Sequence, residues 1–168
     1  MIIVNDNYLS AKEHEVLYGK ITSGTSKSGI PFFFSSAKTS EEEEKTKLDS
    51  FQFFHMFYNA SHVTSPAFDI LEPLLSKLNY KSLVRIKLNL NPYSQKLICS
   101  EYHRDQSFDC KVAIYYLNTN NGYTQFKEGE KKINSVKNRM IFFDSDALHL
   151  GTNSTDCKNR LVLNFNYF

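Results

Sequence analysis

Two separated stretches of the chain carry side chains that bind metals in proteins. His103 and Asp105 are two residues apart, so on a strand an imidazole and a carboxylate would point to the same side. His149 follows after at least two turn signals, where a neighbouring strand can bring a third ligand to the same point. Two histidines and one carboxylate on one face of an octahedron leave further positions open, which suits Fe(II). Zinc binds the same ligands, so these residues alone indicate only a divalent metal.

Arg160 is the residue that could give this site an anionic ligand. It begins the last predicted strand, on the polar side of that strand. A guanidinium grips a carboxylate through two parallel hydrogen bonds, which a lysine cannot reproduce. A buried arginine without an anion carries a desolvation cost of several kcal/mol, so burial of Arg160 would point to an anionic ligand. The alternative is an ordinary salt bridge to Asp144 or Asp156.

The elements that must position these residues begin with two predicted helices. Ser10 and Glu13 have the spacing of a capping box, which predicts a helix over about residues 10–21. Pro66 can occupy the first turn of a second helix that reaches to about Lys77. Its apolar residues recur at spacings of three and four, which predicts one buried face.

The rest of the first half has no helical pattern. Residues 22–30 are rich in Ser, Thr, Gly and Lys and predict a loop, after which Phe32-Phe33-Phe34 predicts buried, extended chain. Residues 51–58 are too aromatic to remain in water and must pack against other elements. The acidic run Glu41–Glu44 predicts a solvated helix start or a loop, with a lid over a site as the alternative.

The second half predicts a run of short strands. From Leu83 the apolar period changes to two, and turn signals recur. These signals are Asn91-Pro92, Asn120-Asn121-Gly122, Glu128-Gly129 and Asn153-Ser154. In the last strand Leu161, Leu163, Phe165 and Tyr167 alternate with Arg160, Val162, Asn164 and Asn166, and after Leu83 Ile86, Leu88 and Leu90 oppose Arg85, Lys87 and Asn89. If the apolar faces pack on the N-terminal helices, the polar faces line a barrel-like cavity for a polar ligand. The alternative is a sheet with its polar face in water.

Length, charge and cysteines limit the remaining possibilities. The 168 residues suit one α+β domain in which helices cover one face of a sheet. A net charge of +2 is too mild for a nucleic-acid surface. The three cysteines form no C-x-x-C pair and no secretion signal precedes them, so we expect reduced thiols and a cytoplasmic protein. No stretch approaches the roughly 20 apolar residues of a membrane span.

Taken together, these motifs resemble a known enzyme superfamily over about half the chain. The resemblance runs from about Leu83 to Phe168 and is carried by His103-Arg104-Asp105, Ile114-Tyr115-Tyr116-Leu117-Asn118, Asn120-Asn121-Gly122-Tyr123-Thr124, Asn138-Arg139-Met140-Ile141-Phe142-Phe143-Asp144, His149 and Arg160-Leu161-Val162-Leu163-Asn164-Phe165. In this order the motifs are similar to the catalytic core of Fe(II)/2-oxoglutarate-dependent dioxygenases, particularly the prolyl-hydroxylase-like branch. The opening Asp6-Asn7-Tyr8-Leu9-Ser10 is similar to the start of such enzymes, including small phage-encoded ones, which would place the protein in a host cytoplasm.

The resemblance implies a fold and a set of site residues. The fold would be mainly β, a double-stranded β-helix (jelly roll) over residues 81–168, with residues 1–80 as a helical support region of the same 1–168 domain and its helices packed on the major sheet. His103, Asp105 and His149 would bind Fe(II), and Arg160 would hold the far carboxylate of 2-oxoglutarate with help from Tyr116. Asn91 and Tyr93 resemble an N-x-Y element beside the cosubstrate, and Asn164 would be a further wall residue.

The resemblance also implies a reaction. Fe(II), 2-oxoglutarate and O2 would hydroxylate a protein or peptide side chain, prolyl by nearest analogy, with succinate and CO2 as co-products. A small-molecule hydroxylase and a nucleic-acid demethylase are alternatives within the family. An inert jelly-roll binding module and a zinc hydrolase are alternatives outside it.

The chain departs from the family pattern at one place and contains three further histidines. Asn121-Gly122-Tyr123-Thr124 replaces the commoner paired glycines, which leaves the substrate mouth undefined. We expect His14 on a helix surface, His55 in an aromatic core segment and His62 in a loop, all with structural roles. His55 needs a hydrogen-bond partner there, because a polar ring among aromatic side chains is costly without one.

Overall fold

The computed structural model describes residues 1–24, 29–39 and 49–168 and is mainly β. Within these residues eight strands form one antiparallel sheet in the order β1-β9-β6-β11-β5-β3-β2, with β4 paired to β3, and three strands form a second sheet in the order β10-β7-β8. The large sheet contains β1 (Ile3–Asn5), β2 (Phe33–Ser35), β3 (Gln52–Asn59), β4 (His62–Val63), β5 (Leu83–Pro92), β6 (Lys111–Tyr116), β9 (Arg139–Asp144) and β11 (Asn159–Tyr167). The small sheet contains β7 (Tyr123–Phe126), β8 (Lys132–Asn134) and β10 (His149–Gly151), and the short helix η2 (Glu128–Glu130) joins β7 to β8. The acidic run 41–44 lies outside the described residues.

The first helix is confirmed and the second is shorter than expected. Helix α1 (Ala11–Thr22) begins after Ser10, whose side chain accepts from the Glu13 backbone while the Glu13 carboxylate accepts from the Ser10 backbone. The expected helix over residues 66–77 is instead a 3-10 turn, η1 (Phe68–Leu71), followed by the single turn α3 (Glu72–Leu75). Pro73 explains the break, because it has no N–H to donate back to Asp69.

The N-terminal half contributes strands as well as helices. The aromatic run becomes β3, which pairs antiparallel with β5, and Phe33 and Phe34 pair with β3 from its outer side. Residues 1–80, expected as a helical support region, therefore supply four strands of the large sheet. The extended chain predicted at Phe32-Phe33-Phe34 is confirmed as β2, but Phe33 and Phe34 are exposed and not buried, because β2 lies at the edge of the sheet. Strand β3 is not predicted as a strand, because a continuous aromatic run has neither a period of two nor a period of 3.6.

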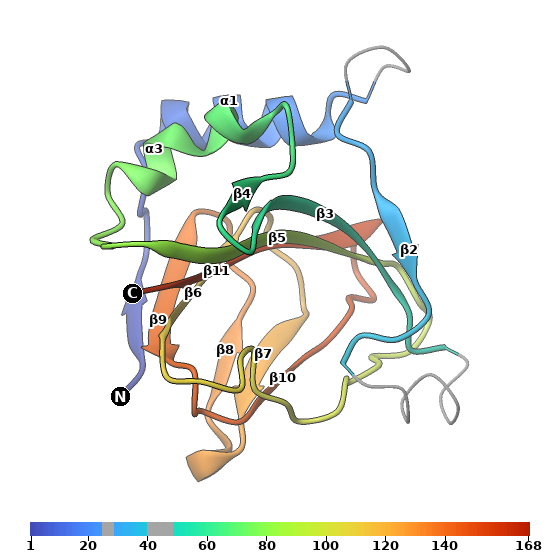
Figure 1. Cartoon of the computed structure of the whole chain (residues 1–168). Coiled ribbons are helices and arrows are strands. Elements are labelled where there is room, and N and C mark those ends of the chain that lie inside the picture. The colour runs from blue at the N-terminus through green and yellow to red at the C-terminus, as the bar shows by residue number, and fades with distance from the viewer. Residues whose placement is uncertain (25–28, 40–48) are drawn as a thin grey trace.

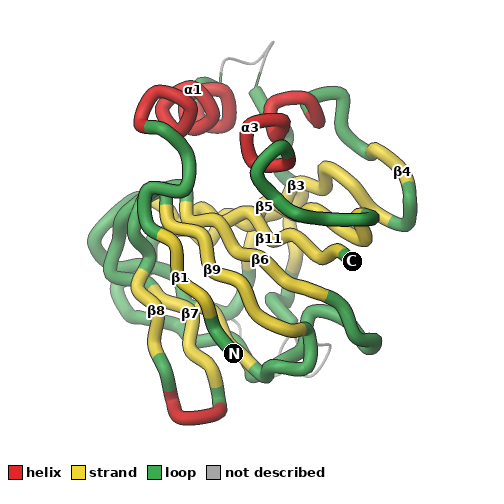
Figure 2. Tube along the Cα trace, turned by 90° about the vertical axis from the view of Figure 1, so that its left-hand side faces the viewer, coloured by secondary structure: helices red, strands yellow, loops and turns green. Residues whose placement is uncertain are grey.

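Two hydrophobic clusters lie on opposite faces of the large sheet. One cluster combines side chains of α1, η1 and α3 with the apolar faces of β5, β6 and β11: Leu17, Ile21, Leu71, Leu74, Ile86, Leu88, Tyr115, Leu161, Leu163 and Phe165 are among its members. The other joins β6, β9 and β11 to the small sheet, through Ile114, Tyr116, Phe126, Ile133, Ile141 and Val162 among others. Figures 1 and 2 show α1 and α3 on the side of the large sheet that faces away from β7, β8 and β10. The alternation predicted for β5 and β11 is confirmed.

Two further expectations concern cysteines and membranes. Cys99, Cys110 and Cys157 are all free, in agreement with reduced thiols. In the part of the chain that the structure describes, no helix is both long and apolar enough to cross a bilayer.

Candidate metal and cosubstrate site

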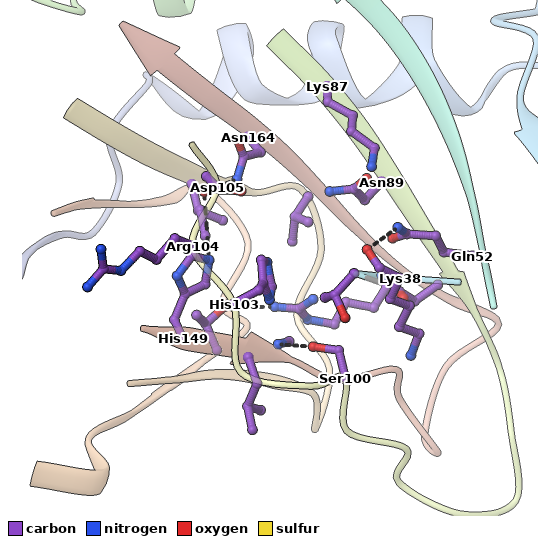
Figure 3. A pocket seen from close by; sticks show the side chains of 18 of the residues that line it. Lys38, Gln52, Lys87, Asn89, Ser100, His103, Arg104, Asp105, His149 and Asn164 are labelled. Carbon is purple, nitrogen blue, oxygen red and sulfur yellow. Dashed lines mark hydrogen bonds and ion pairs between the residues drawn. The ribbon is translucent and has the colours of Figure 1, made fainter. Parts of the chain in front are cut away.

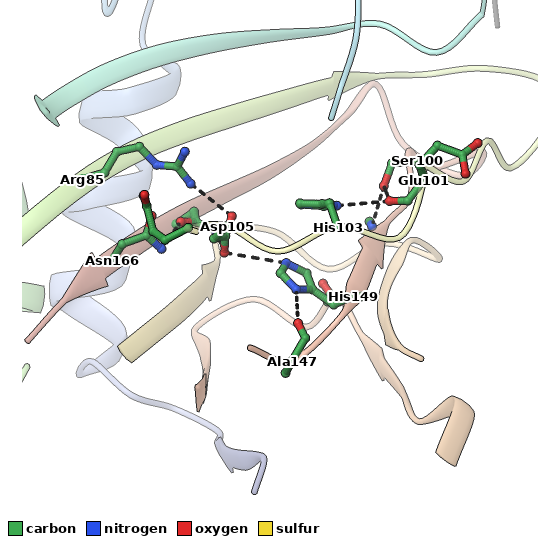
Figure 4. Close-up of polar contacts among 12 residues, drawn as sticks. Arg85, Ser100, Glu101, His103, Asp105, Ala147, His149 and Asn166 are labelled. Atoms are coloured by element: carbon green, nitrogen blue, oxygen red, sulfur yellow. Dashed lines mark hydrogen bonds and ion pairs between the residues drawn. The ribbon is translucent and has the colours of Figure 1, made fainter. Parts of the chain in front are cut away.

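His103, Asp105 and His149 come together at one point, as the sequence predicts. One potential ligand atom from each lies within 4.8 Å of the others. His103 pairs with His149 through two backbone hydrogen bonds of 2.9 and 3.1 Å, and their ring centroids are 4.6 Å apart. The Asp105 Oδ2 atom lies 3.7 Å from His149 Nε2. Figure 4 shows the three side chains converging from the β5–β6 connection and β10.

The expected strand at His103 and Asp105 is wrong. Between β5 and β6 the described backbone makes only isolated bridges, of which His103 to His149 is one. Strand β10 has three residues, and its other edge is taken by β7, so it offers this connection only a short stretch of pairing. The ligands therefore converge because His103 is held by His149 itself.

Both histidines are oriented for metal binding by backbone carbonyls. His103 Nδ1 lies 3.1 Å from the Glu101 oxygen, and His149 Nδ1 lies 3.0 Å from the Ala147 oxygen. A carbonyl only accepts, so each Nδ1 donates its proton there, and each Nε2 is left to face the site. Phe143 packs on the His149 ring with centroids 4.9 Å apart, which further fixes the ring. Such partners are what metal-binding histidines require.

Asp105 is held as an anion by its neighbours. Arg85 Nη2 donates to Oδ1 at 3.1 Å, and Asn164 Nδ2 donates to Oδ2 at 2.9 Å. Burial raises the pKa of Asp105, but the nearby His149 and Arg85 and the Asn164 hydrogen bond outweigh it and bring the pKa below its usual range. A deprotonated carboxylate beside two Nε2 atoms, which can act as ligands, fits a divalent cation.

Arg160 lies buried in the same cavity without a carboxylate partner. It is 3% exposed, and none of the ion pairs between described residues involves it. The alternative salt bridges to Asp144 and Asp156 do not form: Lys111 pairs with Asp144, and Asp156 accepts from the Asn121 backbone. Burial lowers the pKa of Arg160, yet a guanidinium remains charged in proteins.

Neutral groups hold the Arg160 guanidinium in place. Nε donates to Ser135 Oγ at 2.7 Å, Nη1 to the Thr152 carbonyl at 3.2 Å and Nη2 to Thr124 Oγ1 at 3.1 Å. Three of its five N–H groups are used in this way, so each Nη keeps one N–H. Two such N–H groups side by side match the oxygens of a carboxylate.

Tyr116 packs its ring against the guanidinium of Arg160. The guanidinium carbon is 5.5 Å from the centre of the Tyr116 ring, and the phenol donates to Thr124 Oγ1 at 2.8 Å. Burial raises the pKa of Tyr116 although Arg160 opposes the shift, so the phenol stays protonated and remains a donor. Thr124 and Ser135, which no sequence signal separates from other hydroxyl residues, are additional members of this site.

Gly122 is the one glycine that this chain has where the family pattern has a pair, and its surroundings explain why it is a glycine. A side chain there would place its Cβ 2.4 Å from the Asn153 carbonyl oxygen and 2.6 Å from Arg160 Cδ. The glycine therefore lets the turn before β7 approach the stem of Arg160. The need for glycine at position 122 comes from a contact with a distant residue, Arg160, which the local sequence does not show.

The cavity has a volume of about 270 Å³ and is lined by both the metal residues and Arg160. Figure 3 shows the labelled side chains of β5 and β11 directed into it. Of the other predicted residues, Asn91 and Asn164 line this cavity, whereas Tyr93 is 53% exposed and lies outside its lining. Asn164 donates to Asp105, one of the three candidate metal ligands, and not to Arg160.

The remaining histidines have structural surroundings, but His14 is not on the surface as expected. It is buried, with Nδ1 2.7 Å from the Tyr115 hydroxyl, because the helix turns this position onto the sheet. His55 has the partners that its burial requires: Nδ1 lies 2.7 Å from the Pro31 carbonyl oxygen and Nε2 2.8 Å from Ser65 Oγ. His62 is exposed and belongs to the short strand β4, not to a loop as expected.

Comparisons with known proteins identify the fold. No protein-family model and no curated protein matches the chain. Among solved structures, a prolyl hydroxylase from Trichoplax adhaerens, in complex with a hypoxia inducible factor peptide fragment, is similar with a TM-score of 0.71 and 15% identity over 99% of this chain and 83% of that one.

Further similar structures are microbial and viral. The 2OG complex of a viral collagen prolyl hydroxylase from Paramecium Bursaria Chlorella virus-1 gives a TM-score of 0.65 and 16% identity over 98% of this chain and 94% of that one. A prolyl-4-hydroxylase from Pseudomonas putida gives 0.67 and 13% over 99% and 91%. The chain thus has the fold of these hydroxylases.

Proposed function

We propose that this protein is a 2-oxoglutarate- and Fe(II)-dependent dioxygenase of the prolyl-hydroxylase-like branch, built on one jelly-roll domain over residues 1–168. The observation that carries the proposal is Arg160, a buried cation without an acidic partner among the described residues, in the same cavity as His103, Asp105 and His149. A desolvated guanidinium with two remaining N–H groups calls for an oxyanion, and a dicarboxylate shared with a metal supplies it.

The residues have distinct roles in this proposal. His103, Asp105 and His149 would hold Fe(II), and Arg160 would bind the far carboxylate of 2-oxoglutarate. When bound, iron, 2-oxoglutarate and O2 supply the oxidation of a substrate C–H bond to C–OH, with succinate and CO2 as co-products. Arg85 and Asn164 keep Asp105 deprotonated and oriented, and Tyr116 and Thr124 fix the plane of the Arg160 guanidinium. Asn91 would form part of the cosubstrate wall.

The alternatives explain less of the cavity. A zinc hydrolase with the same three ligands has no use for a buried Arg160 held by hydroxyl groups. An inert jelly roll would not need a deprotonated Asp105 facing two oriented histidines. Likeness to prolyl hydroxylases, one of them in complex with a peptide, supports a protein or peptide side chain as substrate.

The test couples metal binding to 2-oxoglutarate turnover. The iron-loaded protein is incubated with 2-oxoglutarate and O2, and succinate is measured; binding of 2-oxoglutarate to the Mn(II)-loaded protein is measured by calorimetry. We expect His103→Ala to abolish both signals, whereas His62→Ala, which removes an exposed histidine from β4, leaves both unchanged. Absence of succinate together with absence of 2-oxoglutarate binding in the unchanged protein would refute the proposal.

A further inference from the structure

A second cation, Lys87, faces the cavity and makes no ion pair with a described acidic side chain. Its side chain is half-buried on β5, and its ammonium lies 5.0 Å from the centre of the Phe54 ring. No ion pair between described residues includes it. Burial and the neighbouring Arg85 lower the pKa of Lys87 to about 8 although Asp105 opposes the shift, so the amine is still mainly charged at neutral pH. An unpaired ammonium in this position is costly unless a ligand pairs with it.

The residues on either side of Lys87 have unsatisfied polar atoms. Arg85 Nε and Asn89 Oδ1 are buried without a hydrogen-bond partner, and they are the two such side-chain atoms found in the described residues. Residues 85, 87 and 89 alternate along β5, so all three side chains project to the cavity side, and all three line the cavity. Figure 3 shows the Lys87 ammonium directed toward Asn89. The row formed by Arg85, Lys87 and Asn89 thus offers two donors, the Arg85 Nε–H and the Lys87 ammonium, and one acceptor, Asn89 Oδ1.

The strand register separates this row from Arg160. Across β5 and β11, Asn91 faces Arg160, whereas Lys87 faces Asn164, whose amide donates to Asp105. Four residues of strand correspond to about 13 Å, so Lys87 lies level with the metal ligands and Arg160 at the far end. A five-carbon dicarboxylate uses one carboxylate at Arg160 and the other at the metal. No carboxylate of that molecule then remains to pair with the Lys87 ammonium.

We propose that Arg85, Lys87 and Asn89 form a subsite for an oxyanion on the oxidised substrate, a carboxylate or a phosphate, with a hydrogen-bond donor beside it. This rests on the proposed function, because that function assigns the Arg160 end to 2-oxoglutarate. The ammonium and the Arg85 N–H would bind the oxyanion, and Asn89 Oδ1 would accept from the adjacent donor. The preferred substrate would therefore be acidic near the oxidised carbon, in contrast to a neutral prolyl ring alone.

The subsite is tested by binding, independently of turnover. The full chain is saturated with Zn(II) and 2-oxoglutarate, and acetate, methyl phosphate or neutral acetamide is titrated while the NMR signals of the Asn89 side-chain amide are followed. We expect saturable shifts with an oxyanion and none with acetamide; the stronger of acetate and methyl phosphate identifies the carboxylate or phosphate source. Lys87→Gln should weaken oxyanion binding about tenfold or more, the value of one charge-assisted hydrogen bond.

Controls separate this subsite from general charge effects. Lys132→Gln removes an exposed lysine that also lies over a ring, 4.8 Å from the centre of Tyr123, outside the cavity, and should change nothing. Lys87→Arg keeps the charge and should retain binding. Equal responses to acetate and acetamide would refute the subsite, as would unchanged oxyanion binding in a folded Lys87→Gln protein.

Failure of the dioxygenase proposal would be recognised separately. Binding of 2-oxoglutarate is measured first in the same samples. If Lys87→Gln weakens 2-oxoglutarate as strongly as it weakens acetate, the row belongs to the cosubstrate and the subsite is refuted. If 2-oxoglutarate does not bind at all, the dioxygenase proposal fails, and titration of acetate into metal-free Arg160→Met protein still decides whether Lys87 binds oxyanions.

Discussion

Replacing Arg160 by methionine should separate binding from stability. The guanidinium has no acidic partner among the described residues, so its removal leaves no orphaned carboxylate in the cavity. If its role is to bind a ligand, the substitution should weaken 2-oxoglutarate binding strongly while the fold tolerates it. If Arg160 were instead part of a structural ion pair, the substitution should lower the free energy of unfolding strongly and change 2-oxoglutarate affinity little.

The magnitudes follow from the contacts of Arg160. Methionine removes three hydrogen bonds, to Ser135, Thr152 and Thr124, each worth about 1.5–3 kcal/mol because the donor is charged. It also relieves a desolvation penalty of several kcal/mol, so we expect a net loss of about 1–2 kcal/mol in the free energy of unfolding. Loss of the two remaining N–H groups as a carboxylate clamp costs about 3–6 kcal/mol, or about 10²- to 10⁴-fold in 2-oxoglutarate affinity.

Arg139 provides the matched control, since it does have a carboxylate partner. Its Nε and Nη2 lie 2.6 and 3.0 Å from the two Asp6 oxygens, away from the cavity. Calorimetry with the Mn(II)-loaded protein and urea denaturation should show Arg139→Met with unchanged 2-oxoglutarate affinity. The reasoning is refuted if Arg160→Met binds 2-oxoglutarate within about threefold of the unchanged protein, or loses more than about 4 kcal/mol of unfolding free energy, as a broken buried ion pair would.

Three further predictions concern the surroundings of the site. Gly122→Ala should destabilise the protein by about 1–3 kcal/mol in urea denaturation and weaken 2-oxoglutarate binding, whereas Gly19→Ala, where no atom lies within 4 Å, should not destabilise it. Thr124→Val removes the acceptor for the guanidinium Nη2, and calorimetry should show 2-oxoglutarate affinity reduced about tenfold. Burial lowers the pKa of His14 and His55 from 6.5, so the unfolded chain takes up protons first as the pH falls. The free energy of unfolding should therefore decline below about pH 6.5, by at most about 1.4 kcal/mol per pH unit for each histidine, and a double Gln variant should show a flatter profile.

The strand parities show what the sequence could establish. A period of two in β5 and β11 determines which side chains share a face, and burial of the leucines then directs Arg160 and Asn164 inward. The candidate metal ligands can be predicted from the sequence because metal binding is restricted to few residue types. Apolar spacing predicts a longer second helix than the chain forms, because spacing takes no account of the N–H that Pro73 lacks.

Other features depend on contacts between distant segments, which periodicity does not encode. His14 looked solvated among its charged neighbours, yet its ring lies 2.7 Å from the hydroxyl of Tyr115, which is 101 residues away in the chain. Tyr93 shares a parity with Asn91, but β5 ends at Pro92 and the tyrosine ring lies outside the cavity. Parity predicts a side chain's direction only as long as the strand continues.

The two ends of the cavity differ in the partners of their charged side chains. Asp105 has a charged partner, whereas Arg160 has only neutral ones. Near the metal ligands, Asp105 is neutralised in part by Arg85, so a divalent cation adds charge that an incoming anion must balance. At the other end, hydroxyl and carbonyl groups orient Arg160 without neutralising it. Neutral partners preserve the attraction of a buried guanidinium for an oxyanion, whereas an aspartate in place of Ser135 or Thr124 would cancel it. The absence of an ion pair to Arg160 among the described residues, more than the arginine itself, is therefore what suits this end of the cavity to an oxyanion.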